Sequence, residues 1–206
     1  INSFGLNYSI YTYDYRFNPT KGFGISATFS VGQKKIDRIA ALEEIDSTIY
    51  DGVDLNTTQY NGLLELSYFI PIRSRSTIML ANQSATLYAD NERIFQNETF
   101  RIGGLKRLRG FDEESINAST FSIFTFEYRF LLDRNSYFSL FVDQAYYESK
   151  LNKSDDIYDR PFGVGAGFSF ETNAGIFTFN YAVGKQFDNP IQFQAAKVHF
   201  GFLNFF

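Results

Sequence analysis

The residues of this chain that could do chemistry are an arginine, two carboxylates and one histidine. The sequence has no cysteine and one histidine, His199, which excludes a thiolate nucleophile and a cysteine-based zinc site. A lone histidine without such partners does not indicate a metal centre or a catalytic triad. Arg109, Glu127 and Asp143 remain, and opposite charges without an activated nucleophile position a segment more readily than they catalyse a reaction. The sequence therefore predicts no enzyme, no metal and no cofactor.

Two other segments share only part of a ligand-site pattern. Residues 163–168 read GVGAGF, but a further strand pattern follows instead of the helix that a dinucleotide-binding loop requires. Asp155, Asp156 and Asp159 could hold a calcium ion loosely, yet they lack the EF-hand glycine and terminal glutamate. A solvated acidic loop is the favoured interpretation. The net charge of -4 gives no basic footprint for nucleic acid.

One segment differs from its surroundings. Phe100 to Ser115 reads FRIGGLKRLRGFDEES, in which glycines and cationic residues crowd together without a two-residue period. Such a loop cannot lie against lipid, where unpaired backbone groups and charges are costly. Its environment depends on the elements around it.

Those elements are strands with two unlike faces. Aromatic residues make up 19% of the chain, and most of them alternate with small polar residues. From Gly22 to Gly32, for example, apolar side chains fall on one face and Gly, Ser or Thr on the other. The same period predicts nine strands, near 4–17, 21–33, 58–71, 76–90, 119–132, 136–148, 161–172, 175–187 and 192–206.

The lengths of these strands and of their connections indicate the fold class. Most predicted strands have about 11 to 15 residues, whereas soluble strands average about five or six and membrane-spanning ones need about 9 to 11. Tight turns near residues 18–20, 73–75, 133–135 and 172–174 alternate with longer connections, which is the outer-membrane barrel pattern. A soluble β-sandwich or a lipocalin-like barrel is the alternative, disfavoured because charges are nearly absent from one strand face. We therefore predict an all-β, antiparallel transmembrane β-barrel.

The strand count suggests that residues 1–206 are the C-terminal part of a larger barrel. A closed single-chain bacterial barrel normally has an even number of strands, and the first strand here begins on the long-loop rim. We therefore expect earlier strands to be missing from this sequence.

The arginine-rich loop is then expected to fold into the polar lumen. It lies in connection 91–118, the longest between two strands, and Glu127, Arg129 and Asp143 stand on polar strand faces where a buried charge needs a partner. We expect Arg109 to pair with Asp143, with Glu127 nearby. Gly103 and Gly104 are expected to bend the loop inward, and Gly110 is expected to let it pass tightly. Gly163, Gly165 and Gly167 are expected to leave a strip of the barrel wall without side chains.

These motifs resemble those of a known family. Gly103 and Gly104 followed by LRGF at Leu108 to Phe111 resemble the sixth-loop motif of the Omp85 superfamily, the BamA and TamA-like barrel proteins. FVDQA at 141–145 resembles the FxDxG strand motif, with Ala145 where glycine is usual, and Glu127-Tyr128-Arg129 resembles the preceding E-x-R pattern. These three motifs stand in the order and spacing of the family, and Pro19 with Gly22, GVGAGF at 163–168 and the terminal Phe206 also fit.

The resemblance implies the last nine strands of a barrel of about sixteen, and a role in assembly, insertion or translocation of proteins at the outer membrane of a Gram-negative bacterium. It implies outer-membrane lipid and lipopolysaccharide, unfolded barrel or secreted client proteins, and periplasmic accessory or other outer-membrane proteins as partners. Gly201 interrupts the last strand and either weakens a seam or allows close packing. Phe206 is either a C-terminal insertion signature or a plain hydrophobic end.

Two other functions stay open on the sequence. A passive outer-membrane channel would need an open lumen, which the RGF loop argues against. The chain could also be the membrane anchor of a larger fused enzyme of patatin-like type, which a GxSxG motif upstream of Ile1 would support, whereas POTRA repeats there would support assembly. Two smaller expectations are a short helix at 38–45 and an aromatic belt at the short-turn interface, formed by Tyr11, Tyr13, Tyr15, Phe17 and Tyr137.

Overall fold

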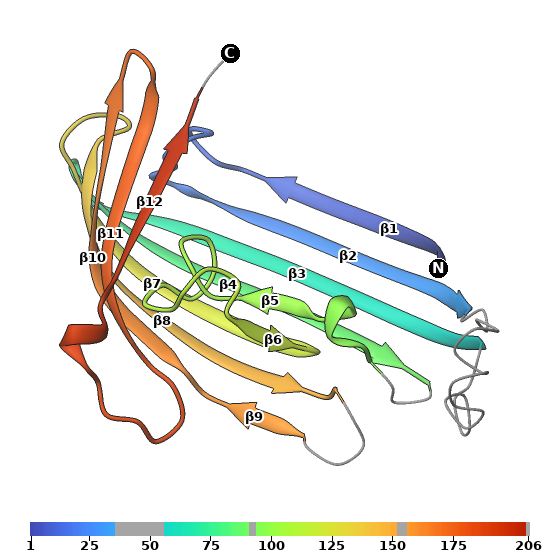
Figure 1. The fold of residues 1–206 in the computed structure, drawn as a ribbon. Helices are drawn as coiled ribbons and strands as arrows, with labels where there is room; N and C mark the ends of the chain where they lie inside the picture. The colour runs from blue at the N-terminus through green and yellow to red at the C-terminus, as the bar shows by residue number, and fades with distance from the viewer. Residues whose placement is uncertain (36–55, 91–93, 152–155, 205–206) are drawn as a thin grey trace.

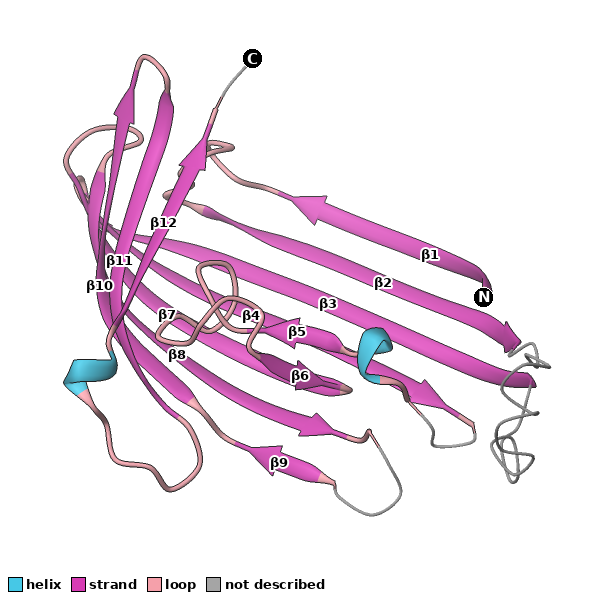
Figure 2. Cartoon of the chain, viewed as in Figure 1, coloured by secondary structure: helices cyan, strands magenta, loops and turns pink. Residues whose placement is uncertain are grey.

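The computed structural model describes residues 1–35, 56–90, 94–151 and 156–204. These residues form one strongly curved antiparallel sheet with a smaller hairpin on its concave side (Figure 1). Helical structure in the described part is confined to two short 3-10 turns, η1 (Gln96–Glu98) and η2 (Phe193–Ala195) (Figure 2). No helix in the described residues is both long enough and apolar enough to span a membrane.

The large sheet is a meander in which each strand lies beside the next one. Its order is β1-β2-β3-β4-β7-β8-β10-β11-β12, with β9 (Ile157–Asp159) paired to β8. The nine strands of this path confirm the predicted all-β antiparallel fold, and in the described structure the path is an open part of a barrel. Their bounds are β1 Asn2–Tyr11, β2 Gly22–Lys35, β3 Asn56–Arg73, β4 Ser76–Ala89, β7 Thr120–Leu131, β8 Tyr137–Ser149, β10 Phe162–Thr172, β11 Gly175–Lys185 and β12 Lys197–Leu203.

The two-residue period of the sequence appears as two different sheet faces. In the β7–β8 ladder, Thr125 lies opposite Asp143 on the concave face, and Phe126 lies opposite Val142 on the convex face. Phe126 is 47% exposed, whereas Phe141, beside Asp143 on the concave face, is 2% exposed. A convex face rich in exposed aromatic and aliphatic side chains suits lipid, and a polar concave face suits a barrel lumen.

Phenylalanine rings cover the convex face of the last four strands near their short turns. The rings of Phe138 and Phe168 have centroids 4.6 Å apart, and those of Phe177 and Phe202 are also 4.6 Å apart. Contacts of this kind run continuously from β8 to β12. They fix the register of these strands by cross-strand packing.

The structure corrects the predicted end of the first strand. We predicted a strand to residue 17, but β1 ends at Tyr11 and the chain then turns inward before β2. Tyr11, Tyr13 and Tyr137 line the lumen cavity, so the predicted aromatic belt is wrong for these three residues. The alternation of tyrosines resembled a strand, but hydrogen bonds inside the lumen outweigh it locally. The last strand also begins later than predicted, at Lys197, because η2 precedes it. The helix predicted at 38–45 lies outside the described residues.

Residues 94–118, which we call the inner loop, lie on the concave side of the sheet. Strands β5 (Phe100–Ile102) and β6 (Ile116–Ala118) pair there as a separate hairpin (Figure 1). A core forms where apolar side chains of the inner loop pack against β4, β7 and β8, and its members are Ala85, Ile102, Leu108, Phe111, Ile116, Ala118, Phe121, Ile123, Ala145 and Tyr147. The inner loop is therefore packed inside the lumen, as the sequence predicted.

Candidate functional site

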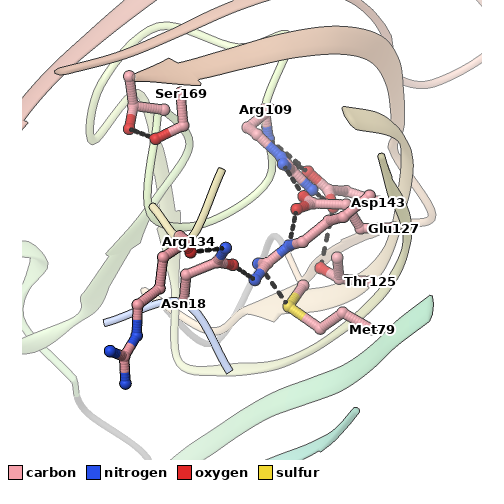
Figure 3. A network of polar contacts seen from close by, with 10 residues as sticks. Asn18, Met79, Arg109, Thr125, Glu127, Arg134, Asp143 and Ser169 are labelled. Atoms are coloured by element: carbon pink, nitrogen blue, oxygen red, sulfur yellow. Dashed lines mark hydrogen bonds and ion pairs between the residues drawn. The ribbon is translucent and has the colours of Figure 1, made fainter. Parts of the chain in front are cut away.

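Arg109 of the inner loop is bound to Asp143 of β8 by three hydrogen bonds (Figure 3). Its backbone N–H donates to Oδ2 at 3.0 Å, Nε donates to Oδ2 at 2.8 Å, and Nη2 donates to Oδ1 at 2.8 Å. The Thr125 hydroxyl donates to the same carboxylate at 2.9 Å. The planar guanidinium can hold both carboxylate oxygens at once, which an ammonium cannot do. The pair predicted from the sequence is thus present.

The network continues from Arg109 toward the short turns. Nη1 of Arg109 donates to Glu127 at 2.5 Å, and Nε of Arg129 donates to the other oxygen of Glu127 at 2.7 Å. Arg129 also donates to the side-chain carbonyl of Asn18 at 3.0 Å and to the sulfur of Met79 at 3.1 Å. The two arginines and the two carboxylates carry a balanced charge.

Burial makes this network depend on complete pairing. Asp143 is 1% exposed, Glu127 is 4% exposed and Arg109 is 9% exposed. The Arg109 guanidinium also lies 3.4 Å from the centroid of the Phe141 ring, a contact that favours a cation. A charge buried to this degree is costly when its partner is removed, so each member of the network holds the others in place.

Glycines at three positions let the inner loop turn and approach the wall. Gly103, Gly104 and Gly110 have φ angles of 111°, 100° and 95°, a region that side chains rarely adopt. Next to this bend, the Glu113 carboxylate accepts a hydrogen bond from the Leu105 N–H at 2.6 Å. A Cβ on Gly104 would collide with that carboxylate. The predicted bend at Gly103 and Gly104 is therefore present.

The glycine strip on β10 is used unevenly. A Cβ on Gly163 would overlap the Arg109 carbonyl oxygen, whereas Cβ atoms on Gly165 and Gly167 would meet neighbouring strand atoms instead. Of the three strip glycines, Gly163 alone therefore makes room for the inner loop, which corrects the expectation for Gly165 and Gly167. Gly184 of β11 was missed by sequence reasoning, although a Cβ there would lie 2.6 Å from the Gly110 carbonyl oxygen. Its position in an alternating strand gave no signal of this contact.

The last strand also meets the inner loop. His199 is 6% exposed and its Nε2 accepts a hydrogen bond from the Gly110 N–H at 3.1 Å, so it lies in the lumen rather than in a catalytic cluster. A Cβ on Gly201 would lie 2.6 Å from a methyl carbon of Leu105, which supports the close-packing interpretation of Gly201. Phe206 lies outside the described residues.

The short turn between β1 and β2 forms a second part of the site that the sequence did not predict. The Asn18 amide donates to the Arg134 carbonyl at 2.8 Å, and the Tyr13 hydroxyl bonds to Ser67 at 2.5 Å. Asp14 accepts hydrogen bonds from Thr20 at 2.8 Å and 2.6 Å. Partial burial favours the neutral acid, but these bonds outweigh it and lower the pKa of Asp14. The turn is therefore anchored inward by its own polar side chains.

The network borders a lumen cavity of about 620 Å³, which extends from the inner loop toward the short turns. Glu127, Arg129 and Asp143 line it together with Gln83, and both carboxylates are engaged by arginines. Within the described ranges, no group of three or more His, Asp or Glu side chains could hold a metal ion. Asp156 and Asp159 belong to those ranges, while Asp155 does not. The chemistry available here is charge pairing, which fixes the position of a loop.

Comparison with known proteins supports the same assignment. The family model described as the Omp85 superfamily domain matches residues 1–203, nearly the whole chain. A comparison with curated proteins gives no match. The curved meander, the inner loop with its LRGF segment and the family match lead to one conclusion: this chain belongs to the Omp85 superfamily.

Proposed function

We propose that this chain forms the C-terminal part of an outer-membrane barrel that helps other polypeptides insert into, or cross, the outer membrane of a Gram-negative bacterium. The observation that carries the proposal is the inner loop, packed into the lumen and bound by Arg109 to Asp143 and Glu127. Membership of the Omp85 superfamily supports the same class of function. In this proposal the chain is not an enzyme, because both carboxylates of its charged cluster are paired with arginines and hold a loop in place.

The packed lumen favours this function over that of a passive channel. A porin needs a continuous aqueous path, and its loops leave that path open. Here Leu108 and Phe111 of the inner loop are buried against the wall, and Arg109 is held by two carboxylates. An open pore would require all of these contacts to break.

The partners follow from the proposed function. The convex face carries exposed aromatic residues such as Phe124 and Phe179, which suit the acyl chains of outer-membrane lipid and lipopolysaccharide. The clients would be unfolded barrel proteins or secreted proteins. Periplasmic accessory proteins or other outer-membrane proteins would be further partners of this chain.

The test is reconstitution of the full protein in liposomes of outer-membrane lipid. A small barrel protein, unfolded in urea, is added as client, and its folded fraction is measured by heat-modifiable migration on a gel. We expect faster client folding than in empty liposomes. Arg109→Ala should reduce the rate, because Asp143 and Glu127 lose their shared cation. Arg101→Ala is the matched control, since Arg101 lies in the same loop but its ion pair with Glu114 is exposed and 3.5 Å long.

A parallel measurement separates the other functions. A secreted client is added outside sealed liposomes, and the fraction that becomes protected from added protease measures translocation. If the wild-type protein promotes neither folding nor translocation and instead gives a steady ion conductance, the chain is a channel. If it does none of these, the role of a membrane anchor for a fused enzyme replaces our proposal.

A further inference from the structure

Strand β12 is the shortest of the nine strands in the described path. It has seven residues, Lys197–Leu203, and its backbone ladder runs to β11, from Ala182 to Ile176. In the described structure β12 is the last strand of the path. A ladder this short holds the strand through few backbone hydrogen bonds, so contacts of its side chains add to its anchoring.

The side chains on the concave face of β12 supply such contacts. Lys197, His199 and Gly201 alternate along that face, and each one meets the inner loop. The Lys197 ammonium lies 2.7 Å from the Asp112 carboxylate, His199 accepts from Gly110 at 3.1 Å, and Leu105 packs over Gly201. One face of the strand is thus bound at three consecutive inward positions.

The histidine contact requires a defined chemical state. A ring nitrogen accepts a hydrogen bond only when it carries no proton, so Nε2 of His199 is unprotonated here. Its Nδ1 then carries the hydrogen and lies 3.9 Å from the Glu113 carboxylate. The Gly110 N–H is buried, and without His199 it would lose its acceptor.

The inner loop reaches the opposite part of the sheet as well. At its beginning, Glu98 forms an ion pair of 2.6 Å with Lys34 of β2, and the Lys34 ammonium lies 4.0 Å from the centroid of the Phe95 ring. Both side chains of the ion pair are largely buried. The inner loop therefore contacts the second strand of the path, the middle strands through Arg109, and the last strand through His199.

We propose that the inner loop is a cross-brace that fastens β12 to the rest of the sheet, with His199 as the positioning residue at that end. Release of the loop would then free the concave face of β12 and leave the strand to its backbone ladder. The inference goes beyond the proposed function, because it states which strand the loop holds and requires no client.

The experiment measures hydrogen exchange of backbone amides in the full protein in lipid nanodiscs. His199→Ala leaves a buried N–H unpaired, so exchange in residues 197–203 should rise roughly five- to a hundredfold. His199→Gln should restore slow exchange, because its side-chain oxygen can accept from Gly110 at the position of Nε2. Exchange in β2, at the other end of the sheet, should stay unchanged in both variants.

A second variant keeps the strand itself intact. Asp112→Ala lies in the exposed part of the loop and should raise exchange in 197–203 by roughly two- to fivefold. The charge-reversed double variant, Asp112→Lys with Lys197→Asp, should return exchange in residues 197–203 to near the wild-type rate. Val198→Thr is the matched control, because Val198 is on the same strand but faces outward and is 70% exposed.

Three results would overturn the proposal. Exchange in residues 197–203 could stay at the wild-type rate in both His199→Ala and Asp112→Ala, which would mean that the backbone ladder alone holds the strand. Val198→Thr could raise exchange as much as His199→Ala does. His199→Gln could fail to restore slow exchange, which would remove the positioning role of the acceptor. A failure of client folding in the liposome assay would not affect any of these readings.

Discussion

Asn18 and Arg129 are 111 residues apart in the sequence, and the Arg129 guanidinium donates a hydrogen bond of 3.0 Å to the Asn18 side-chain carbonyl. Asn18 is 2% exposed and its amide donates to the Arg134 carbonyl at 2.8 Å. One side chain thus ties the turn after β1 to both β7 and the turn before β8 (Figure 3). The charge network therefore extends from the inner loop to the short-turn rim.

We predict that Asn18→Ala destabilises the barrel by about 1 to 3 kcal/mol, because a buried guanidinium and a backbone carbonyl each lose a partner. The midpoint of urea unfolding, followed by heat-modifiable migration, measures the effect. Asn189→Ala serves as control, since the side chain of exposed Asn189 donates to the Gln186 carbonyl in its own loop. Equal midpoints for the two variants would show that the tie contributes nothing to stability.

The pair of Arg109 and Asp143 predicts strong coupling between two mutations. Arg109→Ala and Asp143→Ala should each cost about 3 to 5 kcal/mol, since each one leaves a buried charge without its partner. The double mutant should cost clearly less than the sum, because the second change removes the unpaired charge left by the first. Denaturant unfolding of all four proteins completes the cycle. Additive losses would mean that the two side chains do not act as a pair.

Gly163 and Gly62 form a matched pair of strand glycines. A Cβ on Gly163 would overlap the Arg109 carbonyl, whereas a Cβ on Gly62 would meet only a Thr86 methyl carbon at an ordinary 3.4 Å. Gly163→Ala should therefore displace the inner loop and cost about 1 to 3 kcal/mol, while Gly62→Ala should be nearly neutral. Protease cleavage within the inner loop reports the displacement. A loop that stays protected in Gly163→Ala would contradict the close approach.

The convex face should tolerate no charge near its middle. Phe126 and Phe179 are 47% and 42% exposed on that face, and an arginine near the midplane of a bilayer costs about 2 to 4 kcal/mol. Because of this cost, Phe126→Arg and Phe179→Arg should each slow assembly of the protein into lipid vesicles. Gln83→Arg, which points into the lumen cavity, should assemble normally. If the lumen variant were the more damaging one, the two faces would be assigned the wrong way round.

The strands and the loop motif could be predicted because their signals are local. In a strand, successive side chains point to opposite faces, so the period of apolar residues marks strand, face and approximate length without any knowledge of neighbours. The glycines and the arginine in 103–111 likewise stand out against that period. The pairing of Arg109 with Asp143 could be anticipated because Asp143 stands on a polar strand face where a carboxylate needs a cationic partner, and the glycine- and arginine-rich loop supplies cations.

The sequence by itself thus determined the strands, their two faces, the family resemblance and the charge pair. Only the tertiary structure decided how far the sheet curls and which distant groups meet across it. The bond from Gly110 to His199 joins residues 89 positions apart, and Asn18 meets Arg129 only because the turn after β1 folds inward. Tyr13 alternates as a strand residue would, yet it faces the lumen. Such contacts depend on strand register and curvature, which the whole sheet sets through its ladders and packing, and no short stretch of sequence encodes them.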